Sequence, residues 1–141
     1  MNNVFVYCEI EDGIIADVSL ELLTKGRTLA TKLNCKLEAV VIGSDLDGVE
    51  SQVYPYGVDV LHIADDRRLY PYTSLPHTSI LVNLFKQEQP QIALMGATSI
   101  GRDLGPRVSS ALFSGLTADC TALEIGGHED KKEGKTYTDL L

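Results

Sequence analysis

Two arginines and an aspartate, Arg102, Asp103 and Arg107, lie close together in the sequence, on either side of Pro106. They follow Gly101, a residue type that lets a backbone approach a bound group closely. Guanidinium groups pair with carboxylates and phosphates through well-matched hydrogen bonds. Two interpretations stay open. The arginines bind an anionic group of the same chain, a cofactor or a partner, or they form ordinary salt bridges with local acids at the surface.

The segment before these residues has the order of a ligand-binding loop in an α/β protein. An apolar run over residues 92–95 leads into Gly96-Ala97-Thr98-Ser99-Ile100-Gly101. Strand–loop–helix units of this kind place sites at the carboxyl ends of strands, and a helix N-terminus can bind phosphate. The sequence nevertheless lacks the patterns G-x-G-x-x-G and G-x-x-x-x-G-K-[ST]. The loop after the first expected strand would also repel a triphosphate unless a metal ion intervenes, because it carries Glu9, Glu11, Asp12 and Asp17.

Other reactive residue types give weaker signals. His62 alternates with apolar residues, which is more typical of a core or edge-strand histidine than of a catalyst. His77 and His128 are expected in loops. The sequence shows neither a His, Cys, Asp and Glu set at metal-ligand spacing nor a G-x-S-x-G nucleophile elbow. An enzyme in its own right therefore has no support, and neither catalytic nor metal-binding residues are predicted.

Size and charge narrow the function classes. The 141 residues are enough for one domain. Twenty acidic against twelve basic residues give a net charge of −8, so neither nucleic acid nor an anionic membrane surface is an expected partner. No apolar run approaches the roughly 18–20 residues that cross a bilayer, so membrane insertion is not expected. Three widely spaced cysteines, Cys8, Cys35 and Cys120, indicate a reducing, cytoplasmic compartment.

The chain alternates between strand-like and helix-like segments. Apolar, β-branched runs predict strands over residues 4–10, 36–43, 58–64, 92–95 and 118–125. Helical spacing predicts helices over residues 18–33, with Ser19 as N-cap, over 49–53 and over 78–89. Alternation of this kind is typical of a three-layer, doubly wound α/β domain with a mainly parallel sheet, here one domain over residues 1–141. A short extra strand is expected over residues 136–141.

Pro106 constrains the start of the last helix. A proline is tolerated in the first turn, where its missing N–H has no partner. Asp103 is therefore predicted as the N-cap, a contribution of about 0.5–2 kcal/mol. The buried stripe of this helix is then predicted to be Leu104, Val108, Ala111 and Leu112.

One long segment carries a family resemblance. Residues 96–125, GATSIGRDLGPRVSSALFSGLTADCTALEI, closely resemble the signature of the first domain of the electron transfer flavoprotein alpha subunit. The N-terminal segment VFVYCEIEDGIIADVSLELLTKGRTLA and the tripeptide Gly57-Val58-Asp59 are also similar to that family. The resemblance therefore extends over essentially the whole chain.

The resemblance implies an adenine-nucleotide-hydrolase-like α/β fold with a five-stranded sheet of order 3-2-1-4-5. It implies a heterodimer with an electron transfer flavoprotein beta subunit. Such a heterodimer carries electrons through FAD from acyl-CoA or related dehydrogenases, as in fatty acid beta-oxidation, to a quinone reductase or another acceptor. The flavin motifs belong to a following domain. This chain is therefore expected to be the N-terminal domain of a longer subunit, a scaffold and docking surface with no cofactor of its own.

The signature transfers residue by residue to a loop, a helix start and a surface expected to face the partner. The matching positions are Gly101, Arg102, Asp103, Pro106, Arg107, Thr117, Asp119 and Cys120. Gly105 stands where the family usually has alanine. The alternative is a free-standing nucleotide-binding module similar to universal stress proteins, although the glycines at positions 101, 105 and 115 miss the spacing of that family.

Overall fold

The computed structural model describes residues 2–112, 115–117 and 122–124, which form a six-stranded sheet covered by helices and a separate two-stranded hairpin. The sheet order is β5-β4-β1-β6-β8-β7. The pairs β1–β4, β1–β6 and β4–β5 are parallel, so the predicted order 3-2-1-4 of the first four large strands is confirmed. The strands of this sheet are β1 (Val4–Cys8), β4 (Leu37–Gly43), β5 (Val60–Asp65), β6 (Ile92–Leu94), β7 (Gly115–Thr117) and β8 (Ala122–Glu124).

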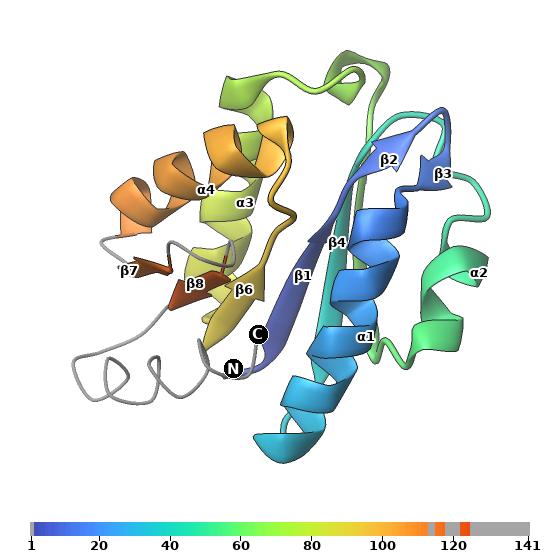
Figure 1. Cartoon of the computed structure of the whole chain (residues 1–141). Coiled ribbons are helices and arrows are strands. Elements are labelled where there is room, and N and C mark those ends of the chain that lie inside the picture. Colours follow the sequence, from blue (N-terminus) through green and yellow to red (C-terminus); the bar gives the residue numbers. More distant parts are fainter. Residues whose placement is uncertain (1, 113–114, 118–121, 125–141) are drawn as a thin grey trace.

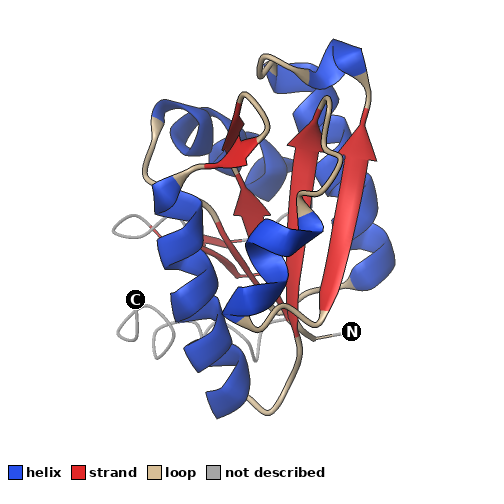
Figure 2. Cartoon of the chain, turned by 90° about the vertical axis from the view of Figure 1, so that its right-hand side faces the viewer, coloured by secondary structure: helices blue, strands red, loops and turns tan. Residues whose placement is uncertain are grey.

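Helices cover both faces of the sheet, which gives the predicted three layers (Figure 1). On one face lie α1 (Asp17–Lys32) and the short α2 (Glu50–Val53); on the other lie α3 (Ser74–Glu88) and α4 (Ser99–Leu112). Two 3₁₀ helices, η1 (Tyr54–Tyr56) and η2 (Arg67–Leu69), flank β5. The view turned by 90° shows the strands running between the two helical layers (Figure 2). Within the described ranges, none of these helices combines the length and apolarity that a membrane crossing requires.

Strand β1 supplies both halves of the core. Its residues are all buried, and successive side chains point to opposite faces of the sheet. Val4, Val6 and Cys8 pack in the cluster beneath α1, whereas Phe5 and Tyr7 pack in the cluster beneath α3 and α4. Because both faces are covered, β1 shows a continuous apolar run rather than the alternation of a half-exposed strand.

The chain departs from the predicted topology after α4. The strand predicted over residues 118–125 is represented by β8, which pairs with β6 in antiparallel orientation. Helix α4 leads first to β7, which takes the outer position, and β8 folds back between β7 and β6. A fifth strand that simply continues the parallel order is therefore not confirmed. The extra strand predicted over residues 136–141 lies outside the described residues.

Two predicted boundaries are wrong for local reasons. The first strand ends at Cys8, and a separate hairpin follows, with β2 (Ile10–Glu11) and β3 (Ile14–Ile15). Its turn residues Asp12 and Gly13 have φ values of 51° and 81°, typical of the tight turn that an Asp-Gly pair favours. Helix α3 begins at Ser74 rather than Thr78, because Pro76 is accommodated in its first turn.

Candidate functional site

The candidate site lies where β1 and β6 end side by side. The helix that follows β1 packs on one face of the sheet, and the helix that follows β6 packs on the other (Figure 1). The two loops therefore diverge at this point, which is where doubly wound proteins bind ligands. The loop after β6 runs directly into α4, so most of the signature positions lie at this edge.

Thr98, rather than Asp103, caps α4. The Thr98 hydroxyl oxygen accepts a hydrogen bond from the Gly101 backbone N–H at 3.1 Å, as an N-cap side chain does. The Thr98 carbonyl accepts the Arg102 N–H at 2.8 Å, the first bond of the helix. The helix thus begins at Ser99, and Pro106 lies in its interior. The prediction that Pro106 belongs to the first turn is wrong.

The predicted buried stripe of α4 is right in its first half only. Leu104 and Val108 are fully buried against the sheet. Ala111 is exposed and Leu112 is half-buried within the described surface.

Glu9 fills the space at the start of α4. Its carboxylate oxygen Oε2 accepts a hydrogen bond from the Thr98 hydroxyl at 2.6 Å. Its backbone N–H donates to the Ser19 hydroxyl at 2.8 Å. Ser19 is therefore a buried partner of the loop and not the N-cap of α1, which begins at Asp17. Glu9 is 8% exposed, so one acid of the loop that was expected to repel a triphosphate is enclosed in the fold.

Close approach requires glycine at position 101 and leaves little room for a side chain at position 96. A Cβ atom on Gly101 would lie 1.8 Å from the carbonyl oxygen of Gly96, a distance that no structure tolerates. A Cβ atom on Gly96 would lie 3.0 Å from Oε2 of Glu9. The signature glycine at position 101 therefore sets how tightly α4 packs on its own loop.

The two signature arginines have different surroundings. Arg107 pairs with Asp103 one turn away, at 3.0 Å, so for this residue the interpretation as a local salt bridge is confirmed. Arg102 is exposed, and its side chain makes neither a hydrogen bond nor an ion pair within the described part of the chain. Arg102 is thus the signature cation that remains available to an anionic group outside these residues.

Asp103 ties α4 to the segment before α3. Its Oδ2 accepts hydrogen bonds from the Tyr72 hydroxyl at 2.6 Å and from the Ser74 hydroxyl at 2.5 Å. These bonds from Ser74 and Tyr72, together with that from Arg107, lower the pKa of Asp103 to about 2. Burial, followed by the bond to Asp103, raises the pKa of Tyr72 to about 12. Asp103 is therefore charged at neutral pH and links α4 to the start of α3 through hydrogen bonds.

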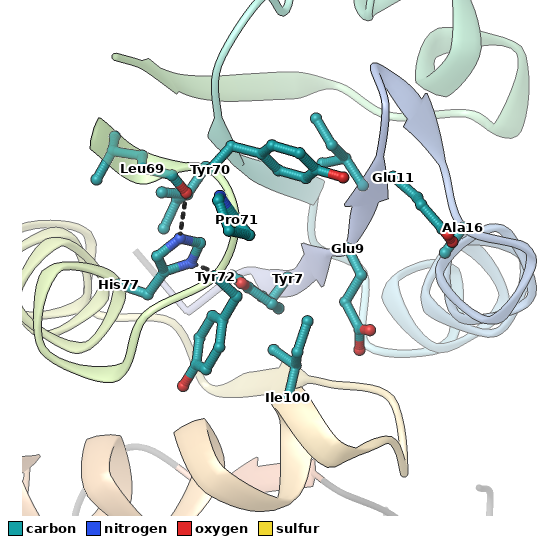
Figure 3. Close-up of a pocket in the computed structure, with 12 residues that line it drawn as sticks. Tyr7, Glu9, Glu11, Ala16, Leu69, Tyr70, Pro71, Tyr72, His77 and Ile100 are labelled. Carbon is teal, nitrogen blue, oxygen red and sulfur yellow. Dashed lines mark hydrogen bonds between the residues drawn. The ribbon is translucent and has the colours of Figure 1, made fainter. Parts of the chain in front are cut away.

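A pocket of about 460 Å³ opens beside Glu9 (Figure 3). His77 is buried in its wall and hydrogen-bonds to the Tyr7 hydroxyl at 2.8 Å and the Leu69 carbonyl at 2.9 Å. Because the carbonyl can only accept, the neutral ring carries its proton on Nε2 and accepts from Tyr7 at Nδ1. Burial lowers the pKa of His77. The pocket is lined by Tyr7, Glu9, Ile10, Glu11, Ala16, Ile42, Leu69, Tyr70, Pro71, Tyr72, His77 and Ile100.

The chemistry of this pocket does not suit a phosphate. Among the described residues that line it there is neither lysine nor arginine, whereas Glu9 and Glu11 both contribute carboxylates. The Glu9 carboxylate is already bonded to the residue that caps α4, the position where an anion would benefit from the helix dipole. These residues therefore do not fit the pyrophosphate of FAD.

The structure brings most predicted site residues together and leaves others outside. Gly101, Arg102, Asp103, Pro106 and Arg107 all lie on α4. Thr117 ends β7, and Asp119 and Cys120 lie outside the described residues. Sequence reasoning missed the contributions of Glu9, Thr98, Tyr72 and Ser74. Only Thr98 carried a signal, since a threonine before a helix is a common N-cap.

Comparison with known proteins gives a consistent result. Residues 4–137 match the family model "Electron transfer flavoprotein domain". The chain is 43% identical over 122 residues to "Protein FixB" of Clostridium saccharobutylicum, covering 86% of this chain and 36% of that protein. It is 38% identical over 129 residues to "Electron transfer flavoprotein subunit alpha" of Megasphaera elsdenii, covering 92% and 38%. It is 37% identical over 123 residues to "Acryloyl-CoA reductase electron transfer subunit beta" of Anaerotignum propionicum, covering 87% and 34%. The chain thus spans little more than a third of the length of these curated relatives.

Proposed function

We propose that this chain, which belongs to the electron transfer flavoprotein family, acts as the first domain of an electron-carrying alpha subunit. The observation that carries the proposal is the match over residues 4–137, supported by relatives named for electron transfer. In this proposal the domain is a scaffold and a docking surface for a beta subunit, and it is not a stand-alone catalyst. Electrons pass from acyl-CoA or related dehydrogenases through FAD to a quinone reductase or another acceptor.

The position of Glu9 supports a structural role for this domain. A nucleotide-binding domain of this fold needs an open, electropositive space at the start of α4. Here an enclosed carboxylate is bonded to Thr98 at that point, and a second acid, Glu11, lines the adjoining pocket. We therefore assign FAD to the domain that follows in the longer subunit, and we place the alternative of a free-standing nucleotide-binding module second.

The docking role is supported by the contrast between the two signature arginines. Arg107 is neutralised by Asp103 within the chain, whereas Arg102 is exposed beside it with no partner among the described residues. A guanidinium group in this setting is suited to a carboxylate on a partner surface. We propose that Arg102 meets the beta subunit and that Asp103 holds α4 in the position that presents it.

The test is to express the reading frame that contains this chain together with its neighbouring partner subunit. The purified complex is denatured, and the released small molecules are identified by mass spectrometry. We expect FAD, and we expect the bound flavin to be reduced by an acyl-CoA dehydrogenase and its substrate. Release of ATP or AMP without any flavin would overturn the electron-carrier proposal and favour the nucleotide-binding module.

A further inference from the structure

Three side chains of metal-ligand type meet at the end of the sheet opposite the candidate site. They are Glu38 on β4, His62 on β5 and Glu88, the last residue of α3. One ligand atom from each lies within 4.8 Å of the other two. In the parallel register Glu38 is opposite Val60 and His62 is opposite Val40, so both side chains project from the same face of the sheet, toward α3.

The cluster is held in place by its surroundings. Glu38 is 3% exposed, and its Oε1 lies 2.7 Å from Nε2 of His62. Its Oε2 accepts a hydrogen bond from the Asn3 side-chain amide at 2.7 Å, and the Asn3 amide oxygen accepts the Lys36 N–H at 3.1 Å. The His62 ring stacks on Phe5 with centroids 5.4 Å apart and an interplanar angle of 16°. Outer contacts of this kind orient ligands in metal centres.

The charges of the cluster call for a cation. The carboxylates of Glu38, which is buried, and Glu88, which is half-buried, lie close together. Like charges repel more strongly away from bulk water than in it. Glu88 also stands at the C-terminus of a 15-residue helix, where the helix dipole disfavours an anion. Within the described residues neither carboxylate forms an ion pair with lysine or arginine, and His62 offers at most one positive charge. A divalent ion would neutralise both carboxylates at once.

We propose that Glu38, His62 and Glu88 form a binding site for a divalent transition-metal ion, with Zn²⁺ the best match. One imidazole nitrogen and two carboxylate oxygens are a ligand set that Zn²⁺ accepts, whereas Mg²⁺ and Ca²⁺ prefer oxygen ligands alone. Tetrahedral ligands at about 2.0–2.2 Å from Zn²⁺ are roughly 3.3 Å apart, so the ion replaces the hydrogen bond between His62 and Glu38 with a small movement. Three protein ligands leave one position for water.

The site is reachable from solvent. His62 lies on the edge strand β5, and its side chain is 25% exposed. Glu88 is half-buried at a helix end, where its side chain can turn toward the ion. The proposal is independent of the electron-transfer function, because Glu38 and His62 lie in the N-terminal halves of their strands, whereas Glu9 follows the C-terminal end of β1.

The test uses the tag-free, 141-residue chain after removal of metal with a chelator. Calorimetric titration with Zn²⁺ measures affinity and stoichiometry, and titration with Co²⁺ reports ligand geometry through its visible absorption. The variants are His62→Gln and Glu88→Gln, and the matched control is Glu21→Gln, an exposed acid on α1. Circular dichroism establishes that each variant is folded.

We expect one Zn²⁺ per wild-type chain, a thermal midpoint that rises with Zn²⁺ concentration, and resistance to competition by excess Mg²⁺. Each ligand variant should bind at least about tenfold more weakly, the scale of loss seen even for outer-shell changes, and Glu21→Gln should bind as wild type does. Absence of saturable binding to the folded wild-type chain would overturn the proposal. So would equal affinity in the ligand variants and the control, or displacement of Zn²⁺ by Mg²⁺.

Discussion

The hydroxyl oxygen of Thr98 lies 2.6 Å from a carboxylate oxygen of Glu9, and it also accepts a hydrogen bond from the Gly101 N–H in the first turn of α4. One threonine thus joins the loop after β1 to the helix after β6. The Thr98 hydroxyl donates its hydrogen to the Glu9 carboxylate and accepts the Gly101 N–H through a lone pair, so it forms both hydrogen bonds at the same time. The loop edge that would be open in a nucleotide-binding protein is closed by this contact.

The Thr98→Val substitution should therefore destabilise the domain. Valine keeps the shape but removes the hydroxyl, so the helix loses its cap and the enclosed Glu9 carboxylate loses a donor. Loss of a cap costs about 0.5–2 kcal/mol and an unsatisfied buried group about 1–3 kcal/mol, so we expect the free energy of unfolding in urea to fall by about 1.5–5 kcal/mol. The matched variant Thr98→Ser keeps the hydroxyl and should stay near wild type. Equal stability of both variants would show that the contact contributes nothing.

Gly101→Ala should be more damaging than substitution of a glycine in open space. The new methyl group would clash with the Gly96 carbonyl oxygen, which is backbone and can move only with the whole loop. We expect a loss of at least about 3 kcal/mol or failure to fold, since overpacking costs about 1–3 kcal/mol where side chains can adjust. Gly48→Ala is the control, because no atom lies within 4 Å of its added Cβ and only its positive φ opposes the change.

The Gly48→Ala variant should lose only about 1–2 kcal/mol, the ordinary cost of a left-handed residue with a side chain. Chemical unfolding followed by circular dichroism measures both variants. A Gly101→Ala protein as stable as Gly48→Ala would mean that α4 can shift away from its loop without loss.

The contrast between β1 and α4 shows what the sequence can predict. Apolar runs such as Val4–Cys8 predict buried strands because burial on both faces leaves no other pattern, and their alternation with helices predicts the parallel order 3-2-1-4. Pro106 and Asp103 carry a strong local signal for a helix start, and this signal misleads for α4. The helix begins earlier, where the Thr98 hydroxyl caps the Gly101 N–H and the Thr98 carbonyl accepts the Arg102 N–H.

The site depends on contacts between distant segments, which local patterns do not contain. Asp103 is bonded to Tyr72 and Ser74, and Glu9 to Thr98, across separations of 29 to 89 residues. Glu9 reads as one acid among several in a polar loop until the fold encloses it. The cluster of Glu38 and His62 is hidden for the same reason. Its members come from separate strands, so their spacing in the sequence does not resemble that of a metal-binding motif.

His77 should make the stability depend on pH. Burial lowers its pKa in the folded state below the ordinary value of about 6.5, so the unfolded chain takes up the proton first as pH falls. The contribution is present in full above about pH 6.5 and is lost progressively below it. We expect the urea midpoint to fall between about pH 7 and pH 5, and we expect His77→Gln to flatten this slope.

The test for His77 compares how steeply the urea midpoint changes with pH in the variant and in the wild type. The midpoints themselves are not compared, because His77→Gln also removes the bond to the Tyr7 hydroxyl and lowers stability at every pH. A slope that survives unchanged in His77→Gln would remove His77 from this account of the pH dependence.

Arg102→Ala should weaken assembly with the partner subunit while leaving the domain intact. The side chain is exposed and makes no bond within the described residues, so its removal should change the unfolding free energy by less than about 0.5 kcal/mol. If it meets a carboxylate on the partner, the dissociation constant should rise at least about tenfold, which is about 1.4 kcal/mol.

Biolayer interferometry of the co-expressed subunits measures the affinity. Arg68→Ala is the control. Arg68 lies on η2 and is also exposed, but its charge is already paired with Asp66 at 2.9 Å. Arg102→Lys should recover only part of the affinity, because an ammonium group cannot form two parallel bonds to one carboxylate. Equal affinity of Arg102→Ala and wild type would remove this residue from the interface, and the signature at positions 101–107 would then be explained by the packing of α4 alone.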